Sequence, residues 1–211
     1  MEKNLCRFCD IVMNYNNGNI QHIYNNPLFE SENFLVLPAL GSLVPGYIMI
    51  ITKHHIPSMA YLNLKELNEL IELVNYLKKI LYEEYNIEPI LFEHGSAVGL
   101  IQESACSVEH AHWHLAPIKF ANEEKIIAEM DAQKVANLRD LSSFRGKTYL
   151  LYVNNNQHYV SNMTTLSSQY MRKWIAKEIG HSDKWNWREN ELLDNIALTV
   201  SEFKKYRKHT N

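Results

Sequence analysis

The segment His110-Ala111-His112-Trp113-His114-Leu115 places three histidines at alternate positions. Side chains alternate across a β-strand, so a strand here would project the three imidazoles from one face. Ala111, Trp113 and Leu115 would then point into a core. Imidazoles aligned in this way can ligate a metal ion, or they can divide the roles of nucleophile, orienting partner and anion-binding group. The segment therefore predicts a strand with chemistry on one face, and the surrounding sequence decides which chemistry.

The composition is that of an ordinary globular protein, with 46% hydrophobic and 21% charged residues in a chain of 211. This length accommodates one large domain, or one domain with an elaborated tail. No apolar run approaches the ~18 residues of a membrane span, and the N-terminus lacks the apolar core of a signal peptide, so we expect a cytoplasmic protein without a membrane partner. The net charge of −3 argues against a general nucleic-acid-binding surface, and we interpret the basic run at 204–208 as a solvated helix end.

The hydrophobic patterns predict an antiparallel sheet with one long helix. Apolar runs at 33–37 and 47–51 indicate two strands separated by a turn segment rich in proline and glycine, and 90–93 indicates a further strand. A capping box formed by Asn63 and the glutamate three residues later precedes apolar residues at helical spacing up to about Tyr85. The predicted fold class is therefore α+β.

Beyond residue 118 the pattern changes to helices and short strands. The expected elements are a helix over 123–141, a strand over 149–153, a helix over 168–179 and a final helix from about Asn190. No clear linker or repeat separates this region from the preceding one. We therefore expect a core over residues 1–118 and a mixed helical C-terminal extension over 119–211, packed on the same sheet.

The segment from Ser107 to Pro117 resembles the signature of the histidine triad (HIT) family of nucleotide hydrolases and transferases, in which three histidines alternate with apolar residues. The segment from Cys6 to Ile11 is similar to the Cys-x-x-Cys opening of many members. The segment from Pro45 to His55 is similar to their Pro-Gly-His, apolar run and Lys-x-His. The resemblance covers about the first 118 residues and implies a HIT-like core. Segments 168–172 and 185–188 resemble, more weakly, the tails of larger HIT-like proteins.

The resemblance implies a role for each residue of the triad. His112 would attack the α-phosphorus of a nucleotide, a role that a neutral imidazole can fill near pH 7, and form a covalent nucleotidyl-histidine that water then cleaves. His114 would donate to a phosphoryl oxygen, and Ser107 would hydrogen-bond the bridging or leaving oxygen. His110 would be a fixed partner beside the nucleophile. The alternative is a polar strand face with hydrogen-bonded imidazoles and no catalytic role.

Cys6 and Cys9 form a Cys-x-x-Cys pair in a chain with three cysteines, a number that cannot make an even disulfide framework. Such a pair points to metal or redox chemistry, and its position at the start of the chain favours a metal. In HIT proteins that carry the pair, it joins two histidines around zinc, which implies Cys6, Cys9, His55 and His110 as ligands here. Four protein ligands would make this zinc structural. His54 is the adjacent candidate if the register is shifted.

Several departures from the family pattern leave the substrate open. Tyr47 stands where a histidine often follows Pro-Gly, Pro38 where an acidic residue commonly holds the ribose hydroxyls, and Cys106 where glutamine or glycine is frequent. Glu93 and His94 stand where Asn-x-Gly is frequent. We expect Glu93 to replace a ribose or metal contact, or His94 to supply a phosphate contact. The alternative is that both are polar residues at a strand end.

Arg172 and Gln169 are the substrate contacts expected from the extension. A phosphate chain needs more positive charge than neutral imidazoles provide, and a guanidinium offers a planar set of donors. Ser168 is a good N-cap for the helix that carries both residues, so free backbone N–H groups could also face an anion there. Alternatively, Arg172 pairs with a surface carboxylate.

These observations favour a nucleotide hydrolase acting on a dinucleoside polyphosphate, a nucleoside phosphoramidate or a similar conjugate. A nucleotidyltransferase or phosphorylase of the same superfamily is the first alternative, although the uridylyltransferase branch has glutamine in the place of His114. A non-catalytic nucleotide-binding protein is the second, in keeping with Tyr47 and Pro38. A catalytic zinc hydrolase with the triad around the metal leaves the cysteine pair unexplained. The resemblance also implies a homodimer, unless the extension covers the pairing surface.

Overall fold

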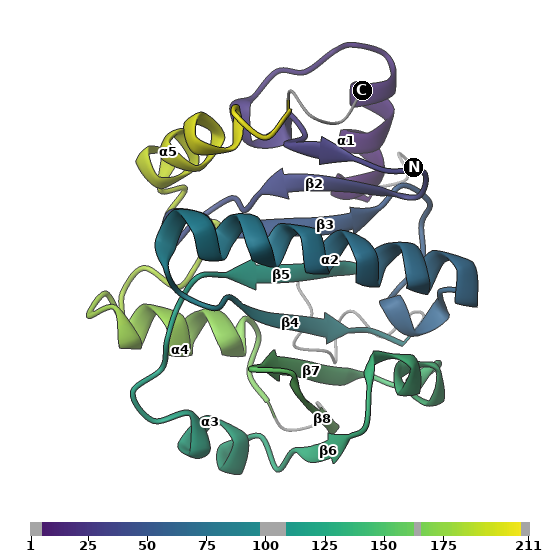
Figure 1. Ribbon diagram of the computed structural model, residues 1–211, viewed down its shortest axis with the longest axis vertical. Helices are drawn as coiled ribbons and strands as arrows, with labels where there is room; N and C mark the ends of the chain where they lie inside the picture. The colour runs from purple at the N-terminus through teal and green to yellow at the C-terminus, as the bar shows by residue number, and fades with distance from the viewer. Residues whose placement is uncertain (1–5, 98–108, 163–165, 208–211) are drawn as a thin grey trace.

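One antiparallel sheet organises the computed structural model, which describes residues 6–97, 109–162 and 166–207. Within those residues, eight strands lie in the order β1-β2-β3-β5-β4-β7-β8-β6, and each neighbouring pair is antiparallel. Figure 1 shows this sheet with helix α2 lying across its near face. The α+β class predicted from the sequence is confirmed.

Strands and helices are interspersed along the described residues. The strands are β1 (Phe29–Glu30), β2 (Phe34–Pro38), β3 (Ile48–Thr52), β4 (Ile90–Gly95), β5 (His112–Ala116), β6 (Gln133–Val135), β7 (Tyr149–Asn154) and β8 (Gln157–Asn162). The α-helices are α1 (Arg7–Asn16), α2 (Leu64–Tyr85), α3 (Glu123–Glu129), α4 (Tyr170–Glu178) and α5 (Leu193–Phe203). Three 3-10 helices are η1 (Ile23–Asn25), η2 (Met59–Tyr61) and η3 (Leu138–Phe144). None of the helices in the described ranges is long and apolar enough to cross a membrane.

Helix α2 begins and ends at positions that its sequence specifies. The Asn63 side chain accepts a hydrogen bond from the Glu66 N–H, and the Glu66 carboxylate accepts one from the Asn63 N–H, so the predicted capping box is confirmed. The helix ends where Asn86 adopts a left-handed φ of 51°. Leu70 and Leu77 on the buried stripe of the helix are fully covered by the sheet. Local capping and hydrophobic spacing therefore agree on the same element.

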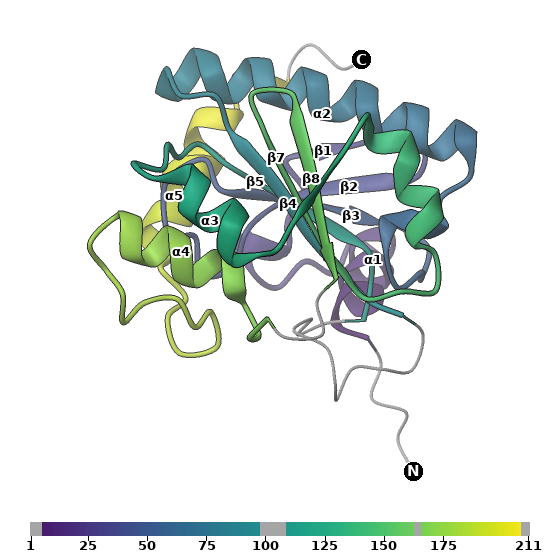
Figure 2. The same ribbon diagram turned by 90° about the horizontal axis from the view of Figure 1, so that it is seen from below.

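The sheet separates two hydrophobic cores, because its central strands are buried on both faces. On the α2 face, Trp113 and Leu115 of β5 pack with the apolar side of the long helix. On the opposite face, helices α1, α3 and α4 contribute apolar side chains such as Phe8, Ile126 and Ile175. Figure 2 shows α2 on one side of the sheet and α1 and α4 on the other. Because successive side chains alternate between the two faces, the position of a residue along a central strand decides which of the two cores its side chain enters.

The helix predicted over residues 123–141 is wrong. Helix α3 ends at Glu129, Asp131 takes a left-handed φ of 48°, and β6 then pairs with β8 at the edge of the sheet. A capping box at Asn137 opens η3. Pairing with a neighbouring strand overrides the helical spacing of this segment.

Strand β8 was not predicted, although the turn before it carries a signal. Asn155 and Asn156 have φ values of 45° and 58°, as the two central residues of a type I′ hairpin require, and asparagine tolerates this conformation. The hairpin joins β7 to β8, and β7 in turn pairs with β4. Strands from both sides of residue 118 therefore share one sheet, while the division into a core and an extension at that residue stays a prediction.

Candidate active site and metal-ligand cluster

Strand β5 lies in the middle of the sheet, between β3 and β4. Its alternation places His112 and His114 on the face away from α2, where their rings contact the aromatic rings of Phe8 and Phe92 respectively. The two histidines are only 7% and 8% exposed, and their ring centroids lie 4.9 Å apart. His110, just before the strand, is fully buried. The structure thus brings the three histidines together at one place on the sheet.

The hydrogen bonding of His112 fixes the position of its proton. Its Nδ1 lies 2.6 Å from the backbone carbonyl oxygen of His110, and a carbonyl oxygen can only accept. Nδ1 therefore carries the proton, and Nε2 keeps its lone pair. Burial lowers the pKa of His112 below its ordinary value, which favours the neutral imidazole. A neutral ring with a free Nε2 lone pair is chemically competent as a nucleophile.

The ring of His114 is held by two aromatic side chains. It stacks on Phe92 with a centroid distance of 4.5 Å and an interplanar angle of 10°, and its Nδ1 lies 3.1 Å from the Tyr47 hydroxyl. Burial lowers the pKa of His114, and the positive charges that His112, His94 and Arg172 can carry lower it further. In the sequence Tyr47 is only a departure from the family pattern, whereas the structure makes it a direct partner of the triad.

His94 adds a fourth imidazole to the same face. It is 6% exposed, and its Nε2 has no hydrogen-bond partner among the described residues. Burial, together with the charges of His112 and Arg172, lowers the pKa of His94 to about 3. An unpartnered buried polar atom carries a desolvation cost that a ligand atom could remove.

Glu93 points to the opposite side of the sheet, so the structure does not bring this predicted substrate contact to the triad. Its carboxylate accepts hydrogen bonds from the Met59 N–H, the Trp113 indole and the Tyr149 hydroxyl, at 2.7, 3.0 and 2.6 Å. The residue is 1% exposed. Because successive side chains of β4 alternate, Glu93 and His94 cannot share a face.

Arg172 and Gln169 both lie in the extension, with polar atoms engaged by neighbouring residues. Arg172 is 4% exposed and donates from Nε to the Trp185 carbonyl and from Nη2 to the Gly41 carbonyl, at 2.8 and 2.7 Å. These donors therefore go to backbone carbonyls rather than to a surface carboxylate. Gln169 bonds to the side chain of Asn186. Direct contact of either residue with substrate stays a prediction.

The predicted Ser168 cap is wrong. Gln169 occupies the N-cap position of α4 with a left-handed φ of 58° and makes no capping hydrogen bond through its side chain. The helix consequently begins one residue later than a Ser168 cap would place it.

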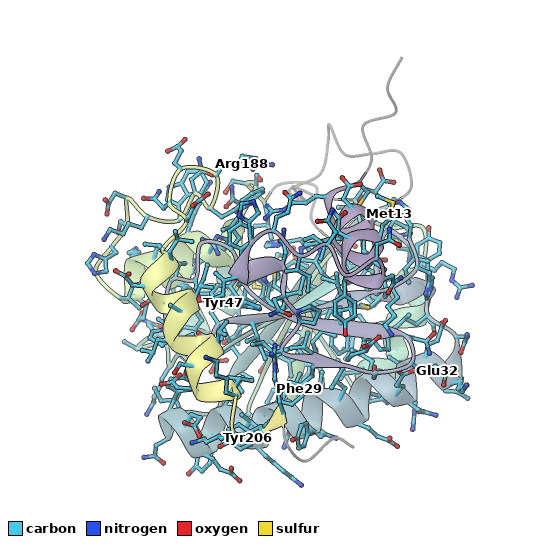
Figure 3. The ribbon with its side chains drawn as sticks, turned by 90° about the horizontal axis from the view of Figure 1, so that it is seen from above. Met13, Phe29, Glu32, Tyr47, Arg188 and Tyr206 are labelled. Atoms are coloured by element: carbon cyan, nitrogen blue, oxygen red, sulfur yellow. The ribbon has the colours of Figure 1, made fainter. Side chains whose placement is uncertain are left out.

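Figure 3 shows Arg188, in the segment that follows α4, on the side of the molecule away from α2. Met13 of α1 lies on the same side.

Four potential metal ligands cluster where α1 begins and β5 is about to start. The ligand atoms of Cys6, Cys9, His55 and His110 all lie within 4.8 Å of one another. His110 Nδ1 lies 3.4 Å from Cys6 Sγ and 3.6 Å from Cys9 Sγ, and His55 Nδ1 lies 3.4 Å from Cys9 Sγ. A tetrahedral zinc ion holds sulfur and nitrogen ligands about 3.5 Å apart, so these separations fit zinc. His54 lies instead 3.7 Å from Glu66, outside the cluster.

Thr52 orients the ring of His110, a contact that no motif in the sequence indicated. His110 Nε2 lies 2.8 Å from the Thr52 carbonyl oxygen, so Nε2 carries the proton and Nδ1 presents a lone pair to the two thiols. Burial and the neighbouring Cys6 raise the pKa of Cys9 to about 11. A cation would offset both effects by stabilising the thiolate.

Ser107 and Cys106 lie outside the described residues. The hydrogen bond expected from Ser107 to the bridging or leaving oxygen therefore stays a prediction.

Comparison with known proteins gives one match to a family. The family described as "Scavenger mRNA decapping enzyme C-term binding" matches residues 6–130. No curated protein matches the chain significantly. This match begins at the first cysteine of the metal-ligand cluster and includes the whole triad strand.

Several solved structures are similar to part of the chain. A HIT-like protein involved in cell-cycle regulation from Bartonella henselae shares 17% identity, covering 55% of this chain and 76% of its own, with a TM-score of 0.43. A HIT family protein from Bacillus anthracis shares 20%, covering 56% and 77%, with a TM-score of 0.45. A zinc-bound histidine triad family protein from Mycobacterium smegmatis shares 18%, covering 56% and 78%, with a TM-score of 0.44.

The family match spans more than half of the chain, and the residues it spans carry three alternating histidines on a buried strand. This chain therefore belongs to the histidine triad family of nucleotide-binding proteins.

Proposed function

We propose that this protein hydrolyses a phosphoric anhydride or phosphoramidate bond of a nucleotide conjugate, such as a dinucleoside polyphosphate, through a covalent intermediate on His112. One observation carries the proposal: His112 Nδ1 donates to the His110 carbonyl at 2.6 Å. That bond leaves the Nε2 lone pair free in a neutral ring, which is the form that can attack phosphorus.

The reaction proceeds in two displacements. In the first, His112 Nε2 forms a bond to the α-phosphorus, and the bond from phosphorus to the leaving group breaks. The ring gains positive charge as the P–N bond forms, and the His110 carbonyl that accepts from Nδ1 stabilises this charge. The leaving group takes up a proton from solvent, and Ser107 is the hydrogen-bond donor that the family pattern implies for it. In the second displacement, water attacks phosphorus and releases a proton to solvent, the P–N bond breaks, and its electron pair returns to Nε2.

His114 and His94 are proposed to bind the phosphoryl oxygens beside the nucleophile. Burial lowers the pKa of both rings, so they act as neutral hydrogen-bond donors rather than as cations. A phosphoryl oxygen at His94 would give its Nε2 the partner that the described residues do not provide. Positive charge near the site comes from Arg172, whose proximity contributes to the lowered pKa of both histidines.

Cys6, Cys9, His55 and His110 are proposed to hold a structural zinc ion. The four ligands complete a tetrahedral set and leave no open position for substrate, so the ion would supply rigidity and no direct chemistry. Bound there, it would link the start of α1 to the residue whose carbonyl orients His112.

The proposal is tested by steady-state turnover of a panel of dinucleoside polyphosphates, nucleoside phosphoramidates and sugar nucleotides. We expect the wild type to hydrolyse at least one class, and His112→Asn to lose at least ~10³-fold in kcat because the covalent route is removed. His181→Asn, which changes an exposed histidine, serves as the matched control and should keep the wild-type rate. Near-wild-type rates in His112→Asn, or no turnover of any conjugate by the wild type, would overturn the proposal.

A further inference from the structure

Tyr47 is the residue through which the C-terminal extension reaches the triad. It precedes β3, is fully buried, and places its hydroxyl 3.1 Å from Nδ1 of His114. The ring of His114 also stacks on Phe92, so its plane is fixed and only the location of its proton remains to be decided. Either Tyr47 donates to Nδ1, or Nδ1 carries the proton and donates to Tyr47.

Arg172 decides between these two arrangements. Its guanidinium carbon lies 5.7 Å from the centre of the Tyr47 ring, so a positive charge stands beside this side chain. A guanidinium has donors and no acceptor, so it attracts the lone pairs of the hydroxyl oxygen and repels the hydroxyl proton. The hydroxyl proton is then directed to the other neighbour, His114 Nδ1.

We propose that Tyr47, oriented by Arg172, holds His114 in the tautomer that carries its proton on Nε2. Nδ1 accepts from Tyr47 and cannot carry a proton at the same time in the neutral ring. His112 and His114 are then opposite tautomers on one strand face: the first presents a lone pair at Nε2 and the second presents an N–H. Resting on the proposed function, this division makes His112 the nucleophile and His114 the hydrogen-bond donor to the phosphoryl oxygen. Tyr47 and Arg172 are positioning residues.

The surroundings of Arg172 leave it little freedom to move. Its Nε and Nη2 donate to the Trp185 and Gly41 carbonyls, which belong to the extension and to the segment between β2 and β3. Gly41 has a φ of +70°, and a Cβ there would lie 2.9 Å from Arg172 Nη2 and 2.8 Å from Trp187 Cβ. The extension therefore holds the guanidinium against Tyr47 by direct packing.

The tautomer can be measured in the free protein by NMR of histidine labelled with nitrogen-15, because protonated and unprotonated ring nitrogens have well separated chemical shifts. We expect wild-type His114 to show a protonated Nε2 and an unprotonated Nδ1. Tyr47→Phe keeps the buried ring and removes the hydroxyl, so we expect it to shift His114 to a mixture of tautomers. Arg172→Lys should give a smaller shift in the same direction. Tyr82→Phe, at an exposed tyrosine, is the control and should leave His114 unchanged.

Turnover supplies the second readout. Tyr47→Phe should lower kcat by ~10- to 100-fold with KM changed little. The variant loses part of the N–H donor population at His114 Nε2, and that donor matters most in the transition state, where charge develops on the phosphoryl oxygen. A wild-type His114 with its proton on Nδ1, or a His114 spectrum unaffected by Tyr47→Phe, would overturn the inference. The NMR measurement uses no substrate. A wild type that hydrolyses nothing in the panel would therefore overturn the proposed function, while the NMR spectra would still decide the tautomer assignment.

Discussion

Glu93 is predicted to make the free energy of unfolding of this protein depend on pH. Its carboxylate is 1% exposed on the α2 face and accepts hydrogen bonds from Met59, Trp113 and Tyr149. Burial nevertheless outweighs these bonds and raises the pKa of Glu93 from 4.5 to about 7. Substituting Glu93→Gln keeps the size and an acceptor oxygen but removes the titration.

The sign and size of the effect follow from this pKa. Between pH 4.5 and 7 the folded state keeps a proton on Glu93 that the unfolded state has lost. The contribution to the free energy of unfolding is therefore fully present below pH 4.5 and is lost as the pH rises through 7. The difference of roughly 2.5 pH units corresponds to about 3 kcal/mol at most. Glu93→Gln lacks this contribution at every pH.

The assay is urea unfolding of the wild type and Glu93→Gln at intervals from pH 4.5 to 8. The free energy of unfolding of the wild type minus that of the variant should fall by about 3 kcal/mol across this range. Taking the difference cancels the titration of the buried histidines, which both proteins share. Glu129→Gln, at an exposed glutamate, should instead follow the wild type. A wild-type advantage that stays constant or grows with pH would show that the Glu93 carboxylate is ionised in the fold, and the reasoning from burial would be refuted.

Two further predictions concern the metal cluster and the end of β4. Purified protein should contain about one zinc per chain by elemental analysis, and Cys9→Ser should lower both the zinc content and the melting temperature; metal-free protein of full stability would contradict the assignment. Gly95→Ala should destabilise the protein by about 2 kcal/mol in urea unfolding, because a Cβ there would overlap the buried ring of Tyr149, whereas an unchanged midpoint would show that the ring can move aside.

The sequence predicted those parts of the fold in which local chemistry and tertiary packing agree. The alternation of His112, Trp113 and His114 gave a strand with two different faces, and the capping box at Asn63 gave the start of α2. The resemblance to the HIT family implied that the cysteine pair meets two distant histidines, and the structure brings their ligand atoms together. In the first two cases the signal lies in residues close in sequence, and in the third it lies in the family resemblance.

The remaining features depend on contacts that no local pattern encodes. Arg172 bonds to carbonyl oxygens of two separate segments, and a backbone carbonyl has no sequence signature. Strand β6 is polar and forms because β8 offers it an edge. The alternation of side chains along β4 places Glu93 and His94 on opposite faces of the sheet, so this one pair of neighbours could supply only one contact to the triad. The homodimer stays a prediction that light scattering can check against the monomer mass of 24.7 kDa.

The stereochemical course at phosphorus tests the central claim most directly, because it does not require the intermediate to accumulate. The substrate is a conjugate from the hydrolysed class with a chiral thiophosphate at the α-position, cleaved in oxygen-18 water. Two in-line displacements, first by His112 and then by water, invert the phosphorus twice, so our account predicts net retention of configuration. Net inversion would mean that water attacks the substrate directly, and it would contradict a covalent role for His112.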